Sequence, residues 1–81
     1  MKIKAYTLST CIYCRMLKDF LNEQGIPFEY VDVDLLEGEE RSAALDEAYS
    51  HCPGCGFPIT VIGDVVVAGF DEPRLREVLG L

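Results

Sequence analysis

Two cysteines three positions apart, Cys11 and Cys14, lie between a segment of strand character and a segment of helix character. Residues 3–8 are predicted to form a strand, because apolar residues occur on both of its alternating sides. Residues 16–22 are predicted to be helical, because their apolar positions continue the helical spacing that starts at Cys14. A strand that turns directly into a helix places Cys11 at the helix N-terminus. There the unpaired backbone N–H groups and the positive end of the helix dipole favour an anion.

This position gives the two thiols different chemical roles. A thiolate is the nucleophile in disulfide exchange, so Cys11 is the candidate nucleophile. Cys14, one turn later, lies on the same helix face and can attack a mixed disulfide formed at Cys11. We prefer a redox pair to a structural metal site or two buried thiols, because C-x-x-C between a strand and a helix is typical of redox sites. Thr10 is the predicted N-cap of the helix.

The next part of the chain predicts a βαβ unit followed by a second helix. Residues 28–34 form the second predicted strand, which should run parallel to the first and connect to it by a right-handed crossover. Residues 37–49 predict a helix with an acidic first turn, which suits the helix dipole. The side chains expected to face inward from this helix are Ala44, Leu45, Ala48 and Tyr49.

The last third of the chain predicts a loop, a hairpin and a final helix. The loop covers residues 50–58, and the hairpin strands are residues 59–62 and 65–68, joined by Gly63-Asp64 in a tight antiparallel turn. Asp71 is expected to cap the last helix. The order β-α-β-α-β-β-α predicts an α/β fold, with a four-stranded mixed sheet that carries helices on both faces.

Length and composition limit the classes of protein. The 81 residues, 49% of them hydrophobic, suffice for one small core, so we expect a single domain over residues 1–81. A net charge of −7 argues against a nucleic-acid partner. No apolar run is long enough to span a membrane, and no signal-peptide pattern is present. We therefore expect a cytoplasmic monomer with no membrane partner; in that compartment C-x-x-C pairs are more often catalytic or metal-binding than structural disulfides.

The whole chain resembles the glutaredoxin family, which has a thioredoxin-like fold. The motifs that carry the resemblance are Tyr6-Thr7, Cys11-Ile12-Tyr13-Cys14, Phe57-Pro58-Ile59 and Gly69-Phe70-Asp71. The stretch from Ala68 to Leu75 also resembles the glutaredoxin-like hydrogen donors of ribonucleotide reductase. Those redoxins take electrons from thioredoxin reductase instead of glutathione.

The resemblance implies a thiol–disulfide oxidoreductase that reduces protein disulfides or glutathione-mixed disulfides and holds no tightly bound cofactor. It implies that Cys11 is the nucleophile and Cys14 the resolving thiol. It implies further that Pro58 follows a cis peptide bond and faces the thiols. The implied substrate-binding residues are Tyr13, Phe57, Pro58, Gly69, Phe70 and Asp71.

The chain departs from the usual glutaredoxin pattern near the first cysteine. Ile12 stands where many family members have proline, and Leu8 stands where many have lysine. Leu8 removes a cation that could pair with a glutathione carboxylate. We therefore expect glutathione to be a poorer electron donor than a flavoenzyme of the thioredoxin-reductase type.

A second pair, Cys52 and Cys55, is absent from ordinary glutaredoxins and leaves three interpretations open. The pair could belong to a zinc or iron–sulfur site completed by Cys11 and Cys14 or by His51. It could be a second dithiol that exchanges with the first pair. It could also be a local disulfide or two idle thiols. We favour the last two, because a metal would occupy the catalytic pair. A metal-binding module that uses all four thiols is the alternative function.

Overall fold

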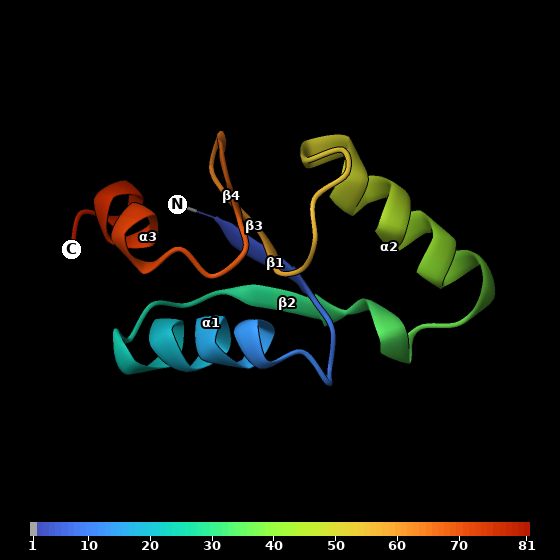
Figure 1. The fold of residues 1–81 in the computed structure, drawn as a ribbon, viewed down its shortest axis with the longest axis horizontal. Coiled ribbons are helices and arrows are strands. Elements are labelled where there is room, and N and C mark those ends of the chain that lie inside the picture. Colours follow the sequence, from blue (N-terminus) through green and yellow to red (C-terminus); the bar gives the residue numbers. More distant parts are fainter. Residues whose placement is uncertain (1) are drawn as a thin grey trace.

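The computed structural model describes residues 2–81, which form a four-stranded mixed sheet with helices on both faces (Figure 1). In chain order the elements are β1 (Ile3–Thr7), α1 (Ile12–Glu23), β2 (Glu29–Asp32), the short 3-10 helix η1 (Val33–Leu35), α2 (Gly38–His51), β3 (Ile59–Ile62), β4 (Val65–Ala68) and α3 (Glu72–Leu79). This order confirms the predicted thioredoxin-like fold class.

The strand order β2-β1-β3-β4 places β1 in the interior of the sheet. Strand β1 pairs parallel with β2 and antiparallel with β3, and β3 pairs antiparallel with β4, as predicted. The chain that leaves β1 therefore emerges from the middle of the sheet. It reaches the start of α1 within four residues, so the cysteines lie at one end of a strand that is hydrogen-bonded on both sides.

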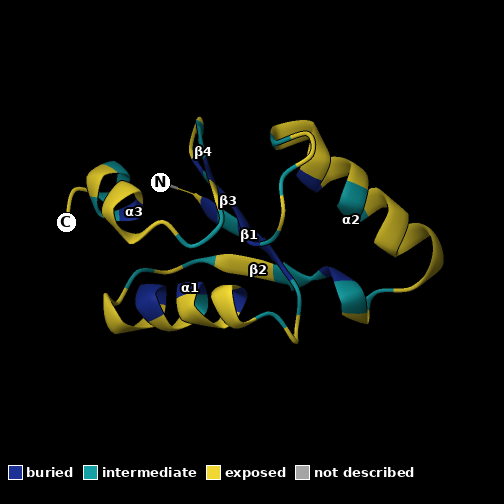
Figure 2. Cartoon of the chain, viewed as in Figure 1, coloured by how far each residue is buried: buried dark blue, intermediate teal, exposed yellow. Residues whose placement is uncertain are grey.

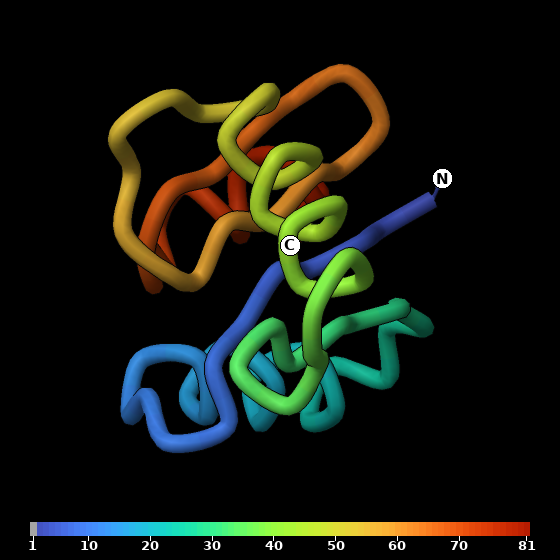
Figure 3. Tube along the Cα trace, turned by 90° about the vertical axis from the view of Figure 1, so that its right-hand side faces the viewer, coloured from blue at the N-terminus to red at the C-terminus, as the bar shows by residue number. Residues whose placement is uncertain are grey.

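Two buried clusters lie on opposite faces of the sheet. The face covered by α1 and α3 buries Ile3, Ala5, Leu17, Phe20, Leu21, Ile62, Val67 and Leu75. The α2 face holds a smaller cluster of Tyr6, Ala48 and Ile59, named the α2-face cluster below. Figure 2 shows that the strands and the inner side of α1 are largely buried, whereas most of α2 is exposed. Figure 3 views the molecule from the α2 side, with α2 in front of the sheet. Helix α2 thus covers the sheet with little apolar surface.

The second strand is shorter than predicted. Residues 28–34 were expected to be extended, but β2 ends at Asp32 and the chain turns into η1. The reason is the register, in which Asp32 lies opposite Thr7, the last residue of β1. Beyond this pair β2 has no neighbour to which its backbone can bond, so the chain is free to turn.

Several helix limits and one orientation also differ from the predictions. Helix α1 begins at Ile12, one residue later than an N-cap at Thr10 predicts, and α2 extends two residues further than predicted, to His51. Tyr49 was expected to face inward but is 39% exposed, whereas Ala48 is completely buried. Adjacent helical positions point in different directions, so Ala48 faces the sheet and Tyr49 does not.

Among residues 2–81 no helix combines the length and the apolar character needed to cross a bilayer.

We predict that Leu17→Ala lowers the free energy of unfolding by about 2–5 kcal/mol, because Leu17 is completely buried between α1 and the sheet. Met16→Ala, one position earlier and 42% exposed, is the matched control and should change it by less than about 0.5 kcal/mol. Urea denaturation followed by circular dichroism measures both. Equal losses in the two variants would contradict the observed packing of α1.

Candidate active site

Cys11 is itself the N-cap of α1. Its backbone is extended (φ −87°, ψ 123°), and its sulfur accepts a hydrogen bond from the backbone N–H of Cys14 at 3.4 Å. The prediction that Thr10 caps the helix is therefore wrong, because the helix begins one residue later and the thiol takes the place of a capping hydroxyl. The prediction that Cys11 lies at the helix N-terminus is confirmed.

The surroundings of Cys11 favour its thiolate. Partial burial raises the pKa of Cys11, but hydrogen bonds from the Cys14 thiol and from the backbone N–H groups of Cys14 and Tyr13 outweigh it. The net result is a pKa below the ordinary value for cysteine. An anion at the first turn also meets the positive end of the helix dipole. Since the thiolate is the attacking form, this sulfur is set up for disulfide exchange at moderate pH.

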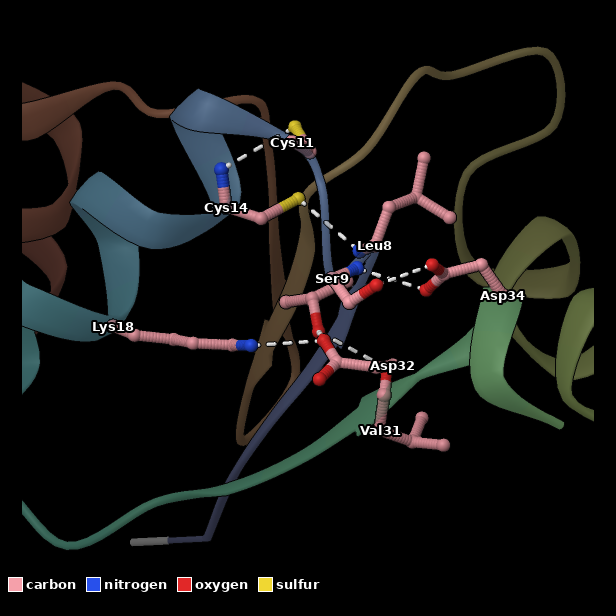
Figure 4. Close-up of polar contacts among 9 residues, drawn as sticks. Leu8, Ser9, Cys11, Cys14, Lys18, Val31, Asp32 and Asp34 are labelled. Atoms are coloured by element: carbon pink, nitrogen blue, oxygen red, sulfur yellow. Dashed lines mark hydrogen bonds and ion pairs between the residues drawn. The ribbon is translucent and has the colours of Figure 1, made fainter.

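Cys14 has the opposite character. It is completely buried, and its sulfur accepts a hydrogen bond from the backbone N–H of Leu8 at 3.4 Å (Figure 4). Burial and the hydrogen bond to Cys11 raise the pKa of Cys14 to about 12, although the Leu8 N–H and the Lys18 cation act in the other direction. Cys14 therefore remains a protonated thiol until Cys11 has reacted.

An ion pair lies beneath Cys14, between α1 and the end of β2. Lys18 Nζ lies 2.8 Å from Asp32 Oδ1, with side-chain exposures of 20% and 14%. Thr7 donates a hydrogen bond from its hydroxyl to the same Asp32 oxygen at 2.5 Å. Lys18 is one helical turn after Cys14 and provides a positive charge close to the buried thiol (Figure 4).

A second carboxylate fixes the loop before Cys11. Asp34 accepts hydrogen bonds from the backbone N–H of Ser9 at 2.8 Å and from its hydroxyl at 2.5 Å. These hydrogen bonds hold the pKa of Asp34 below its usual value. Asp32 and Asp34 were not predicted from the sequence to be site residues. The available signal was two aspartates at the C-terminal end of the predicted strand 28–34.

The loop before β3 places a backbone carbonyl next to the nucleophile. The Phe57–Pro58 peptide bond is cis, as the resemblance implied, and Pro58 is buried. The carbonyl oxygen of Phe57 lies 4.0 Å from Cys11 Sγ. Gly69 connects to this loop, since its N–H donates to the Pro58 carbonyl at 2.7 Å. Cys11, Phe57, Pro58 and Gly69 thus belong to one continuous region.

The other residues implied by the resemblance differ in how directly they join this region. Tyr13 is 58% exposed beside Cys11. Phe70 packs edge-to-face on Phe20, in the second half of α1, with ring centroids 6.0 Å apart. Asp71 accepts a hydrogen bond from the Arg74 N–H and caps α3, as predicted. The structure therefore gives Phe70 and Asp71 roles in packing and capping, and gives Tyr13 an open side chain.

Cys52 and Cys55 are joined to each other by a disulfide, whereas Cys11 and Cys14 are free thiols. In this state the second pair offers no thiolate to a metal ion. Over the described range, residues 2–81, no group of three or more His, Cys, Asp or Glu side chains is arranged to hold a metal. A disulfide between Cys52 and Cys55 fits both the local-disulfide interpretation and the oxidised form of a second exchanging pair.

Comparison with known proteins gives a consistent result. The Glutaredoxin family model matches residues 3–67. Methanoredoxin of Methanosarcina acetivorans has a similar structure, with a TM-score of 0.94 and 43% identity over 99% of this chain and 85% of that chain. A glutaredoxin of Archaeoglobus fulgidus gives a TM-score of 0.92 and 36% identity over 96% of this chain and 85% of that chain.

The glutaredoxin-like protein NrdH-redoxin of Escherichia coli is a more distant neighbour, with a TM-score of 0.76 and 26% identity over 95% of this chain and 93% of that chain. The family model covers most of this chain, and the similar structures have the same fold over nearly all of it. This protein therefore belongs to the glutaredoxin family of thiol–disulfide oxidoreductases, with its C-x-x-C motif at Cys11 and Cys14.

Proposed function

We propose that this protein reduces protein disulfides or glutathione-mixed disulfides, with Cys11 as the nucleophile and Cys14 as the resolving thiol. The observation that carries the proposal is the environment of Cys11 Sγ. It accepts a hydrogen bond at the start of α1, has a lowered pKa, and lies 4.0 Å from the Phe57 carbonyl. A nucleophile beside backbone that precedes β3 and is not part of the sheet is suited to a target that presents a sulfur on an extended peptide.

In the first step the Cys11 thiolate attacks one sulfur of the target disulfide. A bond forms between Cys11 and that sulfur, and the other target sulfur leaves as a thiolate and takes a proton. The backbone N–H groups that stabilise the Cys11 thiolate before attack also lower its intrinsic nucleophilicity to some degree. The gain is a larger thiolate fraction at neutral pH.

In the second step Cys14 loses its proton and attacks Cys11. This releases the reduced target and leaves a Cys11–Cys14 disulfide, which an external donor reduces with two electrons. The positive charge of Lys18 and the Leu8 N–H both favour the Cys14 thiolate that must form here. Asp32 holds the Lys18 ammonium at 2.8 Å, so we propose that this ion pair positions the charge.

We propose that the Phe57 backbone and Pro58 hold the target beside Cys11 and that Tyr13 covers it from the side of α1. Tyr13 suits this role because its ring is exposed and apolar while its hydroxyl can bond to a polar group. Gly69, Phe70 and Asp71 are proposed to receive the glutamyl end of a glutathione-mixed disulfide. The N–H of Gly69 is already bonded to Pro58, which ties this segment to the target-binding loop.

For the electron donor we propose a flavoenzyme of the thioredoxin-reductase type in preference to glutathione. Leu8 offers no cation to glutathione, and NrdH-redoxin of Escherichia coli, a structural neighbour, has a thioredoxin-like activity profile. We further propose that the protein acts in the cytoplasm as a monomeric single domain of residues 1–81.

We predict that Cys11→Ser reduces dithiol-dependent disulfide reduction to the rate of the blank. Cys14→Ser should instead accumulate a mixed disulfide with the target, because Cys11 can attack but nothing resolves the intermediate. Turnover assays combined with intact-mass analysis of trapped adducts distinguish the two. If Cys11→Ser kept its turnover, the nucleophile would have to be Cys52 or Cys55.

The lowered pKa of Cys11 predicts the pH dependence of its alkylation. The rate with iodoacetamide should rise as pH increases and level off once Cys11 is ionised, with a midpoint below that of an ordinary cysteine. Cys14, with a pKa of about 12, should stay unmodified over the same range. Cys14→Ala removes the hydrogen bond that the Cys14 thiol donates to Cys11. In this variant the midpoint of Cys11 alkylation should therefore move to higher pH. A wild-type midpoint above the ordinary value would contradict the proposed activation.

We predict that Leu8→Lys raises the kcat/KM for glutathione by up to about fivefold, since an exposed ion pair contributes about 0.2–1 kcal/mol. The rate with thioredoxin reductase as donor should be nearly unchanged and serves as the internal control. Steady-state kinetics with both donors measures this. If the wild-type protein used both donors equally well, Leu8 would not lower the kcat/KM for glutathione, and the prediction would be contradicted.

A further inference from the structure

The second cysteine pair has no part in the mechanism above, yet it lies on the segment that leads into the active site. Cys52 is the C-cap of α2, and its N–H donates to the Ala48 carbonyl at 3.2 Å. The Cys55 N–H donates to the Cys52 carbonyl at 3.2 Å, with Gly54 between them at φ +76°. The disulfide closes this turn into a small covalent ring at the end of α2.

The ring is attached directly to the backbone that faces Cys11. Phe57, whose carbonyl oxygen is 4.0 Å from Cys11 Sγ, follows Cys55 by two residues. The Phe57 ring lies 6.1 Å from that of Tyr49 between centroids, and Cys52, Cys55 and Phe57 all pack against the α2-face cluster. Opening or closing of the ring can therefore alter the position of the Phe57 carbonyl, which is only two residues along the chain from Cys55.

The disulfide is also open to attack. Cys52 and Cys55 are both half-buried, whereas Cys14 is completely buried. Within one molecule, Cys11 Sγ lies 4.0 Å from the Phe57 carbonyl oxygen. Exchange between two molecules requires both sulfur sites to be accessible. Both the Cys11 thiol and the loop disulfide are half-buried and reach the surface.

We propose that Cys52–Cys55 is a second redox site, which accepts two electrons from the Cys11–Cys14 dithiol of another copy of this protein and thereby controls how firmly Phe57 is held beside Cys11. The inference rests on the proposed function, because Cys11 is the attacking group. The oxidised ring holds the loop in the form seen here. Reduction opens the ring and lets residues 52–57 move, while α1 and β1 keep the catalytic thiols in place.

The exchange balances in two steps. The Cys11 thiolate of the donor copy attacks one sulfur of the Cys52–Cys55 bond, an intermolecular disulfide forms, and the other loop sulfur leaves and takes a proton. Cys14 of the donor copy then loses its proton and attacks its own Cys11. The second loop sulfur leaves as a thiolate and is protonated. The donor ends with a Cys11–Cys14 disulfide and the acceptor with two loop thiols, so two electrons and two protons have moved.

Two variants separate the sites and test the transfer. The donor is the fully reduced Cys52→Ser/Cys55→Ser protein, and the acceptor is Cys11→Ser/Cys14→Ser with its loop disulfide intact. The two variants have the same composition, so the donor is labelled with a heavy isotope of nitrogen to separate their masses. After mixing and acid quenching, intact-mass analysis should show the labelled donor lighter by two hydrogens and the unlabelled acceptor heavier by two. A donor that also carries Cys11→Ser should transfer nothing.

Failure of this transfer can be told apart from failure of the proposed function. If the donor reduces a low-molecular-weight disulfide normally but leaves the acceptor oxidised, the inference is overturned and the proposed function stands. If the donor reduces neither, both are overturned.

A second measurement tests the link to the loop. With a glutathionylated peptide as target, Cys52→Ser/Cys55→Ser should show a KM several-fold above that of the wild-type protein with an intact loop disulfide, and an unchanged kcat. The single variants Cys52→Ala and Cys55→Ala should reproduce this change, since either one opens the ring. Equal KM values for the open and closed rings would overturn the proposed control of Phe57.

Discussion

The hydrogen bond from the Cys14 N–H to Cys11 Sγ is the interaction on which the chemistry of this protein depends. It uses a donor that every helix leaves unpaired at its first turn, and it gives that donor to a sulfur instead of a hydroxyl or a carboxylate. The same contact therefore starts α1 and favours the Cys11 thiolate. A change that breaks this hydrogen bond consequently removes both the cap of α1 and the stabilisation of the Cys11 thiolate.

The two thiols are kept chemically different by polar groups that the sheet brings together. Asp34 anchors the loop before Cys11 through Ser9, and Asp32 holds Lys18 beneath Cys14. Both carboxylates lie where the pairing between β1 and β2 ends. Because β2 ends there, one carboxylate points toward α1 and the other toward the loop after β1.

Much of this arrangement could be predicted from the sequence. The C-x-x-C spacing between a strand and a helix predicted the position of Cys11, and Gly63-Asp64 predicted the hairpin, because both signals are local. The Asp32–Lys18 ion pair could not be predicted in this way, since it depends on the register between β1 and β2. The misassigned N-cap has a different reason. Thr10 and Cys11 can both cap a helix, and only the backbone angles distinguish them.

The thin contact between α2 and the sheet bears on how proteins of this kind diversify. Ala48 is the only fully buried residue of α2, so the remainder of this helix is under weak packing constraint. Apart from Glu47, whose carboxylate accepts hydrogen bonds from Lys4 and from the buried Tyr6, its exposed positions can gain or lose charge over many generations at little cost to the fold. The sequence of α2 can therefore diverge among such proteins while the dithiol chemistry, carried by β1 and α1, is inherited unaltered.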